Sequence, residues 1–464
     1  MGELEPEVVA LLRKYALQNA LEYDGQGQTG SVMGRVMGEN PDLRARASEL
    51  TGFIDEQVAE ANALAAEMGL EHVRSILEEE APDALEKKVK ERREGLPPLP
   101  NAESGKVVLR FAPNPNGPLS LGHARGVVIN SELARMYDGE VILRFDDTDT
   151  VVKRPDPEAY SLIEEDFVWL AGKAPDRILK ASDRMDVYLE HASLALRENH
   201  AYVCQCTADE FKEFRMSKTE CPCRNRASEE NLNLWNQMND GSIQPGGAVV
   251  RIKTEMTLPN PALRDWPALR IQHGDHPLVG ERYKVWPLLD FQSAVEDHLQ
   301  GVTHIVRGKD LMDSTRKQTL LYEKFGWTYP ETLYWGRVKV HEFGGFSTSQ
   351  MKSDIAEGRY TGWDDPRLPT LAGLRRRGVP AGAIREFCQR IGVTKQDNLV
   401  EVELLEFCIR QELEGRAPRA MAVLEPLRVL VTNFEGEDEV LNAPWHPQYP
   451  EMGTRELLFG RELF

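Results

Sequence analysis

Apolar positions near the N-terminus recur with the spacing of a helix. Residues 1–95 carry two such stripes, one at Val8, Leu11, Leu12, Tyr15 and Ala16 and the other at Val58, Ala61, Ala65 and Met68. The segment then becomes densely charged and ends at the proline-rich stretch 96–100, which has the composition of a stiff linker. We therefore predict an N-terminal helical extension over 1–95, either a solvated bundle or an appendage that binds a protein partner.

The rest of the chain changes its pattern several times. Strands and helices alternate over 96–195 as in one half of a doubly wound parallel sheet, and this pattern resumes over 284–355. Between them, residues 196–283 combine cysteines, polar residues and short strands, which indicates an inserted subdomain. Residues 356–413 read as helices and 414–464 as the start of a truncated β-barrel, so we expect a fragment of a longer chain. The predicted fold is a multidomain α/β fold around a Rossmann-type core.

Charge and composition limit the partners of the chain without excluding RNA. Lysine and arginine number 56 against 75 aspartates and glutamates, so no global positive field is available for nucleic acid. A local basic patch would be sufficient for an RNA partner. No run of 18 apolar residues and no secretory leader occur, and six cysteines fit a reducing compartment. We expect a cytoplasmic protein without a membrane partner.

A phosphate-binding unit is predicted where the first apolar strand ends. The strand at 107–111 is followed by two prolines, a glycine and a helical pattern, and a second strand follows at 141–145. The free N–H groups at the start of such a helix attract anions, and Gly117 and Gly122 allow the backbone to approach a phosphate. His123 on the first turn can donate to the same anion. Many βαβ units use glycine only for the turn, so this spacing alone is a weak signal.

The complete string from Arg110 to His123 is more specific than its glycines. It resembles the signature of class I aminoacyl-tRNA synthetases, and within them the glutamyl/glutaminyl group, whose His-Ile-Gly-His tetrad here reads Ser120-Leu121-Gly122-His123. The resemblance implies catalytic roles for Ser120, Gly122 and His123, although a serine hydroxyl can bind a phosphate without carrying positive charge. It also implies that ATP is bound by Pro113, Asn114, Pro115, Asn116, Gly117, Pro118, Leu119, Ser120, Leu121, Gly122 and His123.

Acidic and basic residues that follow the strands form a predicted substrate pocket. The carboxylates of Asp146, Asp147 and Asp149 suit an ammonium group or Mg²⁺, and an acidic loop that caps the next helix is the alternative. Arg307 leaves a buried strand and can bind a carboxylate through two parallel hydrogen bonds, or form a salt bridge with a nearby acid.

The resemblance gives these residues roles in binding L-glutamate. It implies that Asp146 binds the α-ammonium group and that Arg307 and Arg110 bind the side-chain carboxylate, and we place Ser293 in the same pocket. Leu289 stands where the family usually has a tyrosine, so part of this pocket must differ. An arginine that faces the substrate favours glutamate over glutamine, because an amide would leave the guanidinium poorly paired.

Two further strings lie in the second half of the chain. Residues 362–378 resemble the hallmark of glutaminyl enzymes and of archaeal and eukaryotic glutamyl enzymes. The resemblance implies that tRNA is contacted by Arg367, Arg375, Arg376 and Arg377. By composition alone, these arginines could instead form a solvated face. The Lys-Met-Ser-Lys-Ser loop of class I synthetases has no clean copy here. We assign it to 347–353, with Ser347, Thr348 and Ser349 as ATP-binding residues and Lys352 as the candidate catalytic lysine.

Four of the six cysteines form a metal-binding pattern. Cys204 and Cys206 are separated by fourteen residues from Cys221 and Cys223, and four thiolates in two close pairs suit tetrahedral Zn²⁺. We predict a structural zinc site, since no open coordination position is implied. Cys388 and Cys408 lie among apolar helical residues and are predicted to be core residues.

Taken together, the strings resemble those of the archaeal type of glutamyl-tRNA synthetase. Membership would imply that glutamate is joined to tRNA-Glu with ATP and Mg²⁺, and it leaves open whether tRNA-Gln is also charged. A glutaminyl-tRNA synthetase is the nearest alternative and is disfavoured by Arg307. A catalytically weak tRNA-binding or assembly subunit is the other, because Ser120 and the loop at 347–353 depart from the family pattern.

Overall fold

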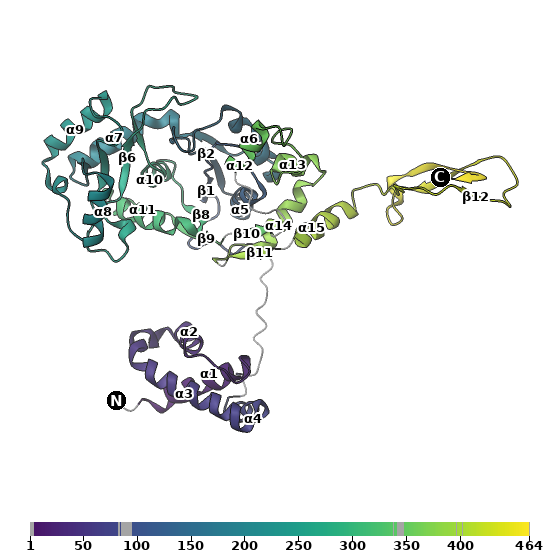
Figure 1. Cartoon of the computed structure of the whole chain (residues 1–464), viewed down its shortest axis with the longest axis horizontal. Coiled ribbons are helices and arrows are strands. Elements are labelled where there is room, and N and C mark those ends of the chain that lie inside the picture. The colour runs from purple at the N-terminus through teal and green to yellow at the C-terminus, as the bar shows by residue number, and fades with distance from the viewer. Residues whose placement is uncertain are drawn as a thin grey trace. The chain divides into compact units, whose positions relative to one another are not determined.

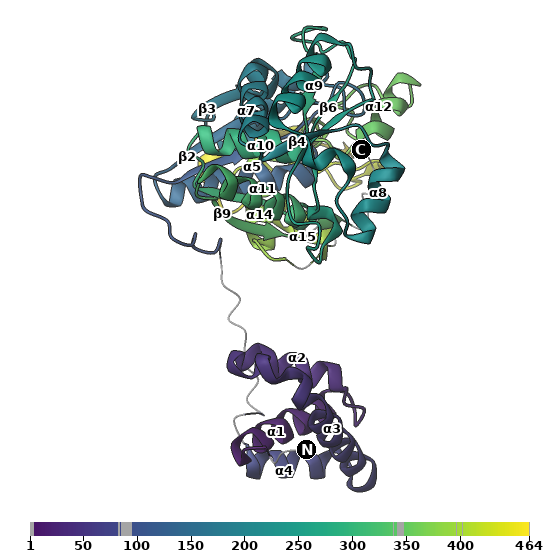
Figure 2. The same ribbon diagram turned by 90° about the vertical axis from the view of Figure 1, so that its left-hand side faces the viewer.

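The structure, a computed structural model, describes residues 4–81, 84, 95–336, 338–340, 348–395, 397–400 and 402–463 (Figure 1). The chain divides into two compact units, Met1–Arg92 and Arg93–Phe464. The first unit contains α1 (Pro6–Glu22), α2 (Thr29–Glu39), a short 3₁₀ helix at Pro41–Arg46, α3 (Ala47–Met68) and α4 (Leu70–Glu80) (Figure 2).

The first unit has its own apolar core, which the stripe pattern predicted in most positions. Leu12, Tyr15 and Ala16 of α1 are buried against Val58 and Ala61 of α3 in one cluster, to which α2 and α4 also contribute. The prediction is wrong for Met68, whose side chain is 58% exposed at the last turn of α3 and does not belong to the buried stripe. The backbone turns there through Gly69 at φ +85°, a conformation that side chains rarely adopt, and the helical phase is lost.

The second unit is built on a parallel sheet. In it β1 (Val108–Phe111), β2 (Glu140–Phe145) and β3 (Arg177–Lys180) lie in the order β1-β2-β3, with α5 (Leu121–Met136) and α6 (Pro157–Ala171) as the connecting helices. A second parallel pair, β8 (His304–Gly308) and β9 (Glu331–Trp335), lies beside β1, because the N–H of Thr303 donates to the carbonyl oxygen of Val108 over 3.0 Å. The predicted strands are therefore present, and their carboxyl ends share one edge.

An antiparallel sheet interrupts this parallel arrangement. Its strands β4 (Ala201–Cys204), β5 (Val249–Ile252), β6 (Pro267–Ile271) and β7 (Val285–Pro287) follow one another in sequence order. Trp266 and Trp286 are completely buried in its core, which packs against α7 (Met185–Arg197), α9 (Ser228–Asp240), α10 (Leu289–Leu299) and α11 (Met312–Phe325). A further helix, α8 (Ala208–Ser217), lies with these elements in Figure 1.

The remaining elements include a strand that the sequence did not predict. Helices α13 (Leu371–Arg376), α14 (Ala381–Ile391) and α15 (Val402–Glu414) lie in the segment predicted to be helical, 356–413, and cover only part of it, while α12 (Thr348–Ala356) precedes it. Within it, however, β11 (Asn398–Val400) pairs in parallel with β10 (Val338–Val340). Cys388 and Cys408 are buried in the core that α14 and α15 share with the parallel sheet, as predicted.

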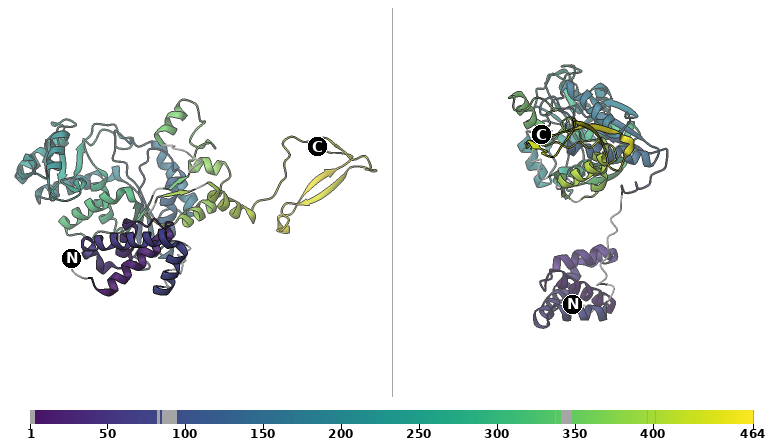
Figure 3. Two further views of the ribbon diagram at one scale, coloured as in Figure 1. Left: turned by 60° about the horizontal axis from the view of Figure 1, so that its bottom comes forward. Right: turned by 90° about the vertical axis from the view of Figure 1, so that its right-hand side faces the viewer.

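The C-terminal segment forms two antiparallel strand pairs. β13 (Glu439–Pro444) pairs with β14 (Thr454–Phe459), and β12 (Val429–Leu430) pairs with β15 (Glu462–Leu463) (Figure 3). Side chains on both members of the longer pair are exposed, for example Val440 and Leu458. Among the described residues, no helix combines the length and apolar character needed to cross a membrane.

Candidate active site

A cavity of about 820 Å³ lies at the carboxyl ends of β1, β2 and β8, which is where open α/β sheets bind ligands. One part of its lining, here called the arginine end, consists of residues at the strand ends and on α10 and α11: Arg110, Asp146, Leu289, Ser293, Arg307 and Gln318. The other part, here called the helix end, surrounds the start of α5: Pro113, Asn114, Asn116, Gly122, His123, Val152, Lys153, Thr348 and Ser349.

The start of α5 is shaped by the glycines of the signature. A Cβ at Gly117 would lie 2.6 Å from Cγ2 of Thr348, and a Cβ at Gly126 would lie 2.6 Å from the ring of Phe111. A side chain at position 117 would push α12 away from the loop before α5, and one at position 126 would push β1 away from α5. Five predicted ATP-binding residues, Pro115, Gly117, Pro118, Leu119 and Leu121, are buried behind the cavity wall and form its support.

Ser120 and His123 form a pair at the first turn of α5. The backbone N–H of Ser120 donates to Nδ1 of His123 over 3.2 Å, and the Ser120 hydroxyl oxygen lies 3.0 Å from the same nitrogen. A nitrogen that accepts these bonds is unprotonated in the neutral ring, so the proton is carried by Nε2, which can donate to an anion. Ser120 therefore contacts His123 from the position where the family motif has its first histidine.

The environment of His123 favours the neutral imidazole. The ring is solvent-accessible at the cavity but surrounded by its walls. Desolvation by these walls, assisted by the positive charge of Lys153, lowers the pKa of His123 below its ordinary value. A neutral ring with its proton on Nε2 is a hydrogen-bond donor to phosphate and not a permanent cation.

A buried network of charges lies behind the arginine end and supports it. Arg144 donates to Asp297 over 2.7 Å, to Asp146 over 2.8 Å and to the hydroxyl of Ser293 over 3.0 Å. Arg110 donates to the same oxygen of Asp297 over 3.2 Å. Burial opposes the charge on Arg144, but the two carboxylates outweigh it and raise the pKa of its guanidinium. Burial likewise disfavours the charged form of Asp297, but the surrounding arginines outweigh it and lower its pKa.

Arg307 is held beside this network by two neutral groups. One of its terminal nitrogens donates to Oε1 of Gln318 over 3.0 Å and to the hydroxyl of Tyr329 over 3.3 Å. Its Nε is buried without a hydrogen-bond partner. Because buried polar groups are normally paired and Arg307 lines the cavity, this guanidinium has unused hydrogen-bonding capacity for a ligand.

The acidic string at 146–149 does not act as one cluster. Asp147 is completely buried, accepts hydrogen bonds from Tyr160 and Ser182, and makes no contribution to the cavity lining. Asp149 accepts from the N–H groups of Val151 and Val152. The idea that three converging carboxylates bind Mg²⁺ is therefore wrong for the described residues, because only Asp146 faces the cavity.

The loop predicted at 347–353 lies partly in the described structure. Ser347 is outside the described residues, whereas Thr348 and Ser349 begin α12 and line the cavity. Lys352 does not line it, because its Nζ forms an ion pair with Asp156 over 2.8 Å. The structure thus places the candidate catalytic lysine on the surface beside the cavity.

The predicted tRNA-contacting arginines are all exposed on or near α13. Arg367 is bound to Asp365 through Nε at 2.9 Å and Nη2 at 2.7 Å. Arg375 lies over the ring of Trp169, and Arg376 pairs with Asp364 over 3.1 Å. The string therefore presents a short basic surface, on which Arg377 has no ion pair with another described residue.

The four predicted metal ligands converge in the antiparallel part of the second unit. All four Sγ atoms lie within 4.8 Å of one another, with Cys204 and Cys221 4.0 Å apart and Cys206 and Cys223 3.8 Å apart. A tetrahedron with Zn–S bonds of about 2.3 Å has edges of about 3.8 Å, so the thiols fit Zn²⁺ closely. The sulfurs are free thiols and not disulfides.

Several important residues were not predicted. Arg144 and Asp297 organise the arginine end, Gln318 supports Arg307, and Lys153 lines the helix end. A charged residue inside the otherwise apolar strand 141–145 was a signal for Arg144. Asp297 and Gln318 gave no comparable signal, since they lie on helices with ordinary amphipathic patterns.

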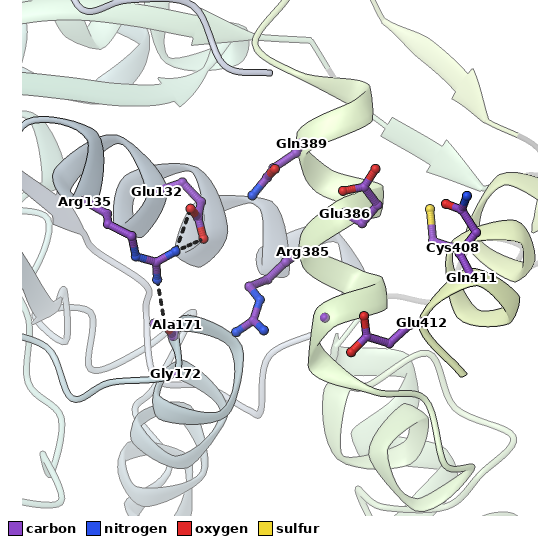
Figure 4. A pocket seen from close by; sticks show the side chains of 11 residues that line it. Glu132, Arg135, Ala171, Gly172, Arg385, Glu386, Gln389, Cys408, Gln411 and Glu412 are labelled. Atoms are coloured by element: carbon purple, nitrogen blue, oxygen red, sulfur yellow. Dashed lines mark hydrogen bonds and ion pairs between the residues drawn. The ribbon is translucent and has the colours of Figure 1, made fainter. Parts of the chain in front are cut away.

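A second cavity of about 690 Å³ lies between α5, the end of α6, α14 and α15 (Figure 4). Its charged side chains are engaged within the protein. Arg135 binds Glu132 and the carbonyl oxygen of Ala171, and Arg385 donates to the carbonyl oxygen of Leu170. Glu386 and Glu412 form ion pairs with Arg390 and Arg416. This cavity has little free capacity for a charged ligand.

Comparison with known proteins gives consistent matches along the chain. Residues 106–415 match the catalytic domain of class I tRNA synthetases (E and Q), and residues 417–464 match the anticodon-binding domain of the same class. The glutamate–tRNA ligase of Methanothrix thermoacetophila is 48% identical over 460 residues, which cover 98% of this chain and 80% of that protein. Those of Methanosarcina acetivorans and Archaeoglobus fulgidus are 45% and 46% identical, over 99% and 97% of this chain and 80% of each relative.

Proposed function

The chain belongs to the glutamyl and glutaminyl family of class I tRNA synthetases, and from this premise we propose that it is a glutamate–tRNA ligase. It activates L-glutamate with ATP and transfers the glutamyl group to the 3′ end of tRNA-Glu. Archaeal glutamate–tRNA ligases that align with nearly the whole chain support this assignment.

The charge balance of the arginine end is the observation that supports glutamate over glutamine. Three buried guanidinium groups, on Arg110, Arg144 and Arg307, face two buried carboxylates, on Asp146 and Asp297. One positive charge remains among these buried groups, while Asp310, the other carboxylate of the cavity lining, is exposed to solvent. Free glutamate carries one net negative charge whereas glutamine carries none. A buried uncompensated charge is expensive, so the pocket favours the ligand that neutralises it.

The residues of the arginine end can bind the two ends of the amino acid separately. We assign the α-ammonium group to Asp146, whose carboxylate is held by Arg144 and Gln292, and the side-chain carboxylate to Arg307 and Arg110. Ser293 bridges Arg144 and Asp146 and holds the geometry of this wall. Leu289 supplies an apolar contact, so no tyrosine hydroxyl is available at that position.

The helix end is suited to the nucleotide. The N–H of Gly122 at the positive end of α5 and the Nε2 proton of His123 are donors for phosphate oxygens, and Thr348 and Ser349 line the same space. Mg²⁺ bound to ATP would neutralise part of the phosphate charge. Activation then requires only positioning and charge stabilisation: the α-carboxylate of glutamate attacks the α-phosphorus and pyrophosphate leaves. A hydroxyl of the terminal tRNA ribose subsequently attacks the activated carbonyl.

The remaining parts of the chain have roles in binding tRNA under this proposal. The basic surface at Arg367, Arg375, Arg376 and Arg377 contacts phosphates of the stem, and the segment 417–464 contributes to anticodon binding as part of a β-barrel. The four thiolates hold a structural Zn²⁺ that fixes the start of the inserted subdomain. The helical unit at 1–92 is a separate module suited to a protein partner.

The test is charging of tRNA-Glu with labelled glutamate and, in parallel, with labelled glutamine. We expect glutamate alone to be incorporated, and Arg307→Ala to reduce incorporation at least about a hundredfold. A matched control is Arg154→Ala, which removes an exposed arginine outside the cavity lining. Incorporation of glutamine would refute the charge-balance argument, and absence of both products would refute the proposed function.

A further inference from the structure

Lys153 lines the helix end of the cavity from the loop between β2 and α6. It is exposed, and it has no ion pair or side-chain hydrogen bond with any other residue that the structure describes. Its neighbour Arg154, in contrast, pairs with Asp275 over 3.0 Å. The lysine therefore presents a free ammonium group to the cavity, whereas the adjacent arginine is turned to the inserted subdomain.

The charge of the helix end depends on this lysine. The other described residues that line it, Asn114, Asn116, Gly122, His123, Thr348 and Ser349, carry no permanent positive charge. His123 is a neutral donor, as its hydrogen bonds and environment show. A triphosphate in this space would find backbone dipoles and hydroxyl groups, with Lys153 as the only cation among the described residues of the helix end.

The backbone that carries Lys153 is fixed on both sides. Asp149 accepts hydrogen bonds from the N–H groups of Val151 and Val152, and the N–H of Asp156 donates to the carbonyl oxygen of Pro115 over 2.7 Å. The second contact joins the loop directly to the signature. The same Asp156 forms an ion pair with Lys352. The segment that carries Lys153 therefore also holds the predicted catalytic lysine outside the cavity.

We propose that Lys153 binds the phosphates of ATP and stabilises pyrophosphate as it leaves. In this step the carboxylate oxygen of glutamate forms a bond to the α-phosphorus, and the bond from that phosphorus to the oxygen bridging to the β-phosphate breaks. The electron pair of the broken bond passes to the pyrophosphate, where the ammonium group of Lys153 neutralises the added charge. This inference rests on the proposed function and adds a residue to its machinery.

The experiment measures glutamate-dependent exchange of labelled pyrophosphate into ATP, with Mg²⁺ and tRNA-Glu present. The proteins are wild type, Lys153→Ala, Lys153→Arg and Arg154→Ala. We expect Lys153→Ala to lower kcat/KM for ATP on the order of thirtyfold, with KM for glutamate within about twofold of wild type. Lys153→Arg should recover most of the loss because it keeps the charge. Arg154→Ala should remain within about twofold, since Arg154 lies outside the cavity lining.

The outcomes separate this inference from the function on which it rests. A wild-type protein without exchange refutes the proposed function. An active wild type with unchanged Lys153→Ala refutes only the role of Lys153, as does an equal loss in Arg154→Ala, which would indicate a general effect on the loop. Binding of α,β-methylene-ATP by calorimetry gives an independent check: affinity should fall in Lys153→Ala and not in Arg154→Ala.

Discussion

The backbone N–H of Leu121 donates to the carbonyl oxygen of Pro369 over 3.1 Å, and this joins the first residue of α5 to the segment that leads into α13. A second bond runs in the opposite direction, from the N–H of Leu371 to the carbonyl oxygen of Leu119, over 2.9 Å. The two diagnostic strings of the sequence therefore form one antiparallel backbone contact. The start of α5 and the basic surface on α13 cannot move independently of each other.

The first prediction concerns Thr370, the buried residue at the centre of this contact. Its hydroxyl donates to the carbonyl oxygen of Trp363 and accepts from the N–H of Gly373, which caps α13. Thr370→Val keeps the shape but loses the cap, which costs about 1 kcal/mol. We expect KM for ATP to rise in pyrophosphate exchange because the start of α5 shifts with α13. Thr361→Val, at an exposed position just before this string, loses only a hydroxyl bond of 3.2 Å to Asp365 and should leave KM for ATP within about twofold.

The second prediction concerns Arg144, which is 1% exposed and pairs with both buried carboxylates. Arg144→Ala leaves Asp146 and Asp297 without their best partner, and breaking a buried ion pair in this way costs roughly 3–5 kcal/mol. The midpoint of denaturant unfolding should fall accordingly. Arg307→Ala should lose activity with a smaller loss of stability, because the hydrogen bonds of Arg307 to described residues go to the neutral groups of Gln318 and Tyr329. Equal stability losses in the two variants would contradict this distinction.

The third prediction separates Ser120 from His123. Ser120→Ala removes the hydroxyl but keeps the backbone N–H that donates to Nδ1, so Nε2 remains the protonated nitrogen. We expect Ser120→Ala to slow glutamate activation less than about fivefold, and His123→Ala, which removes the donor itself, on the order of a hundredfold. Single-turnover measurement of activation distinguishes the two. A loss in Ser120→Ala as large as in His123→Ala would mean that the hydroxyl itself contacts phosphate.

These residues also show how far the sequence could predict the structure. Short apolar runs predicted the strands at β1, β2 and β8, and the prolines and glycine of the signature predicted the start of α5, because these features are local. The partner of Arg144 could not be predicted in this way. Asp297 lies beyond the inserted subdomain in the sequence, and it reaches β2 only when α10 packs beside the sheet.

The acidic string illustrates a different limit. Asp146, Asp147 and Asp149 appear equivalent in sequence, but alternation along the strand end sends Asp147 away from the cavity toward Tyr160 and Ser182. The loop then turns, and the carboxylate of Asp149 accepts hydrogen bonds from the backbone N–H groups two and three residues later in the same loop. Composition alone indicated three candidate ligands, and only the backbone path decides that one of them faces the cavity. β11 was missed for a similar reason, because its three residues acquire a partner only through β10.

The fourth prediction tests the zinc site. Cys221→Ser should lower the zinc content of purified protein to well below one equivalent and lower the thermal midpoint, because a structural site contributes its binding free energy to folding. A chelator should reproduce the lower midpoint in wild type. Cys388→Ser is the matched control, since Cys388 is buried away from the cluster and should leave the zinc content unchanged. Metal-free wild type with an unaltered midpoint would refute the site.

The last prediction is a pH dependence of stability that originates at Asp166. This residue of α6 is 2% exposed, and burial raises its pKa to about 7, although the positive charge of Arg375 and a hydrogen bond from the N–H of Leu119 oppose the shift. The folded protein therefore holds a proton on this group that the unfolded chain releases near pH 4. This bound proton contributes fully to the free energy of unfolding below the pKa of the unfolded chain. The contribution is lost as the pH rises to about 7, the pKa in the folded protein.

Asp166→Asn removes the titration while keeping an acceptor for the N–H of Leu119. We expect the variant to gain roughly 2 kcal/mol relative to wild type between pH 5 and pH 8, measured as the difference in free energy of unfolding in urea. The control is Glu164→Gln, an exposed residue on the same helix that is not among the groups shifting the pKa of Asp166, and its difference from wild type should not change with pH over this range. Because Asp166 lies between the loop at Leu119 and Arg375, a constant difference would mean that these two groups keep it ionised throughout this range.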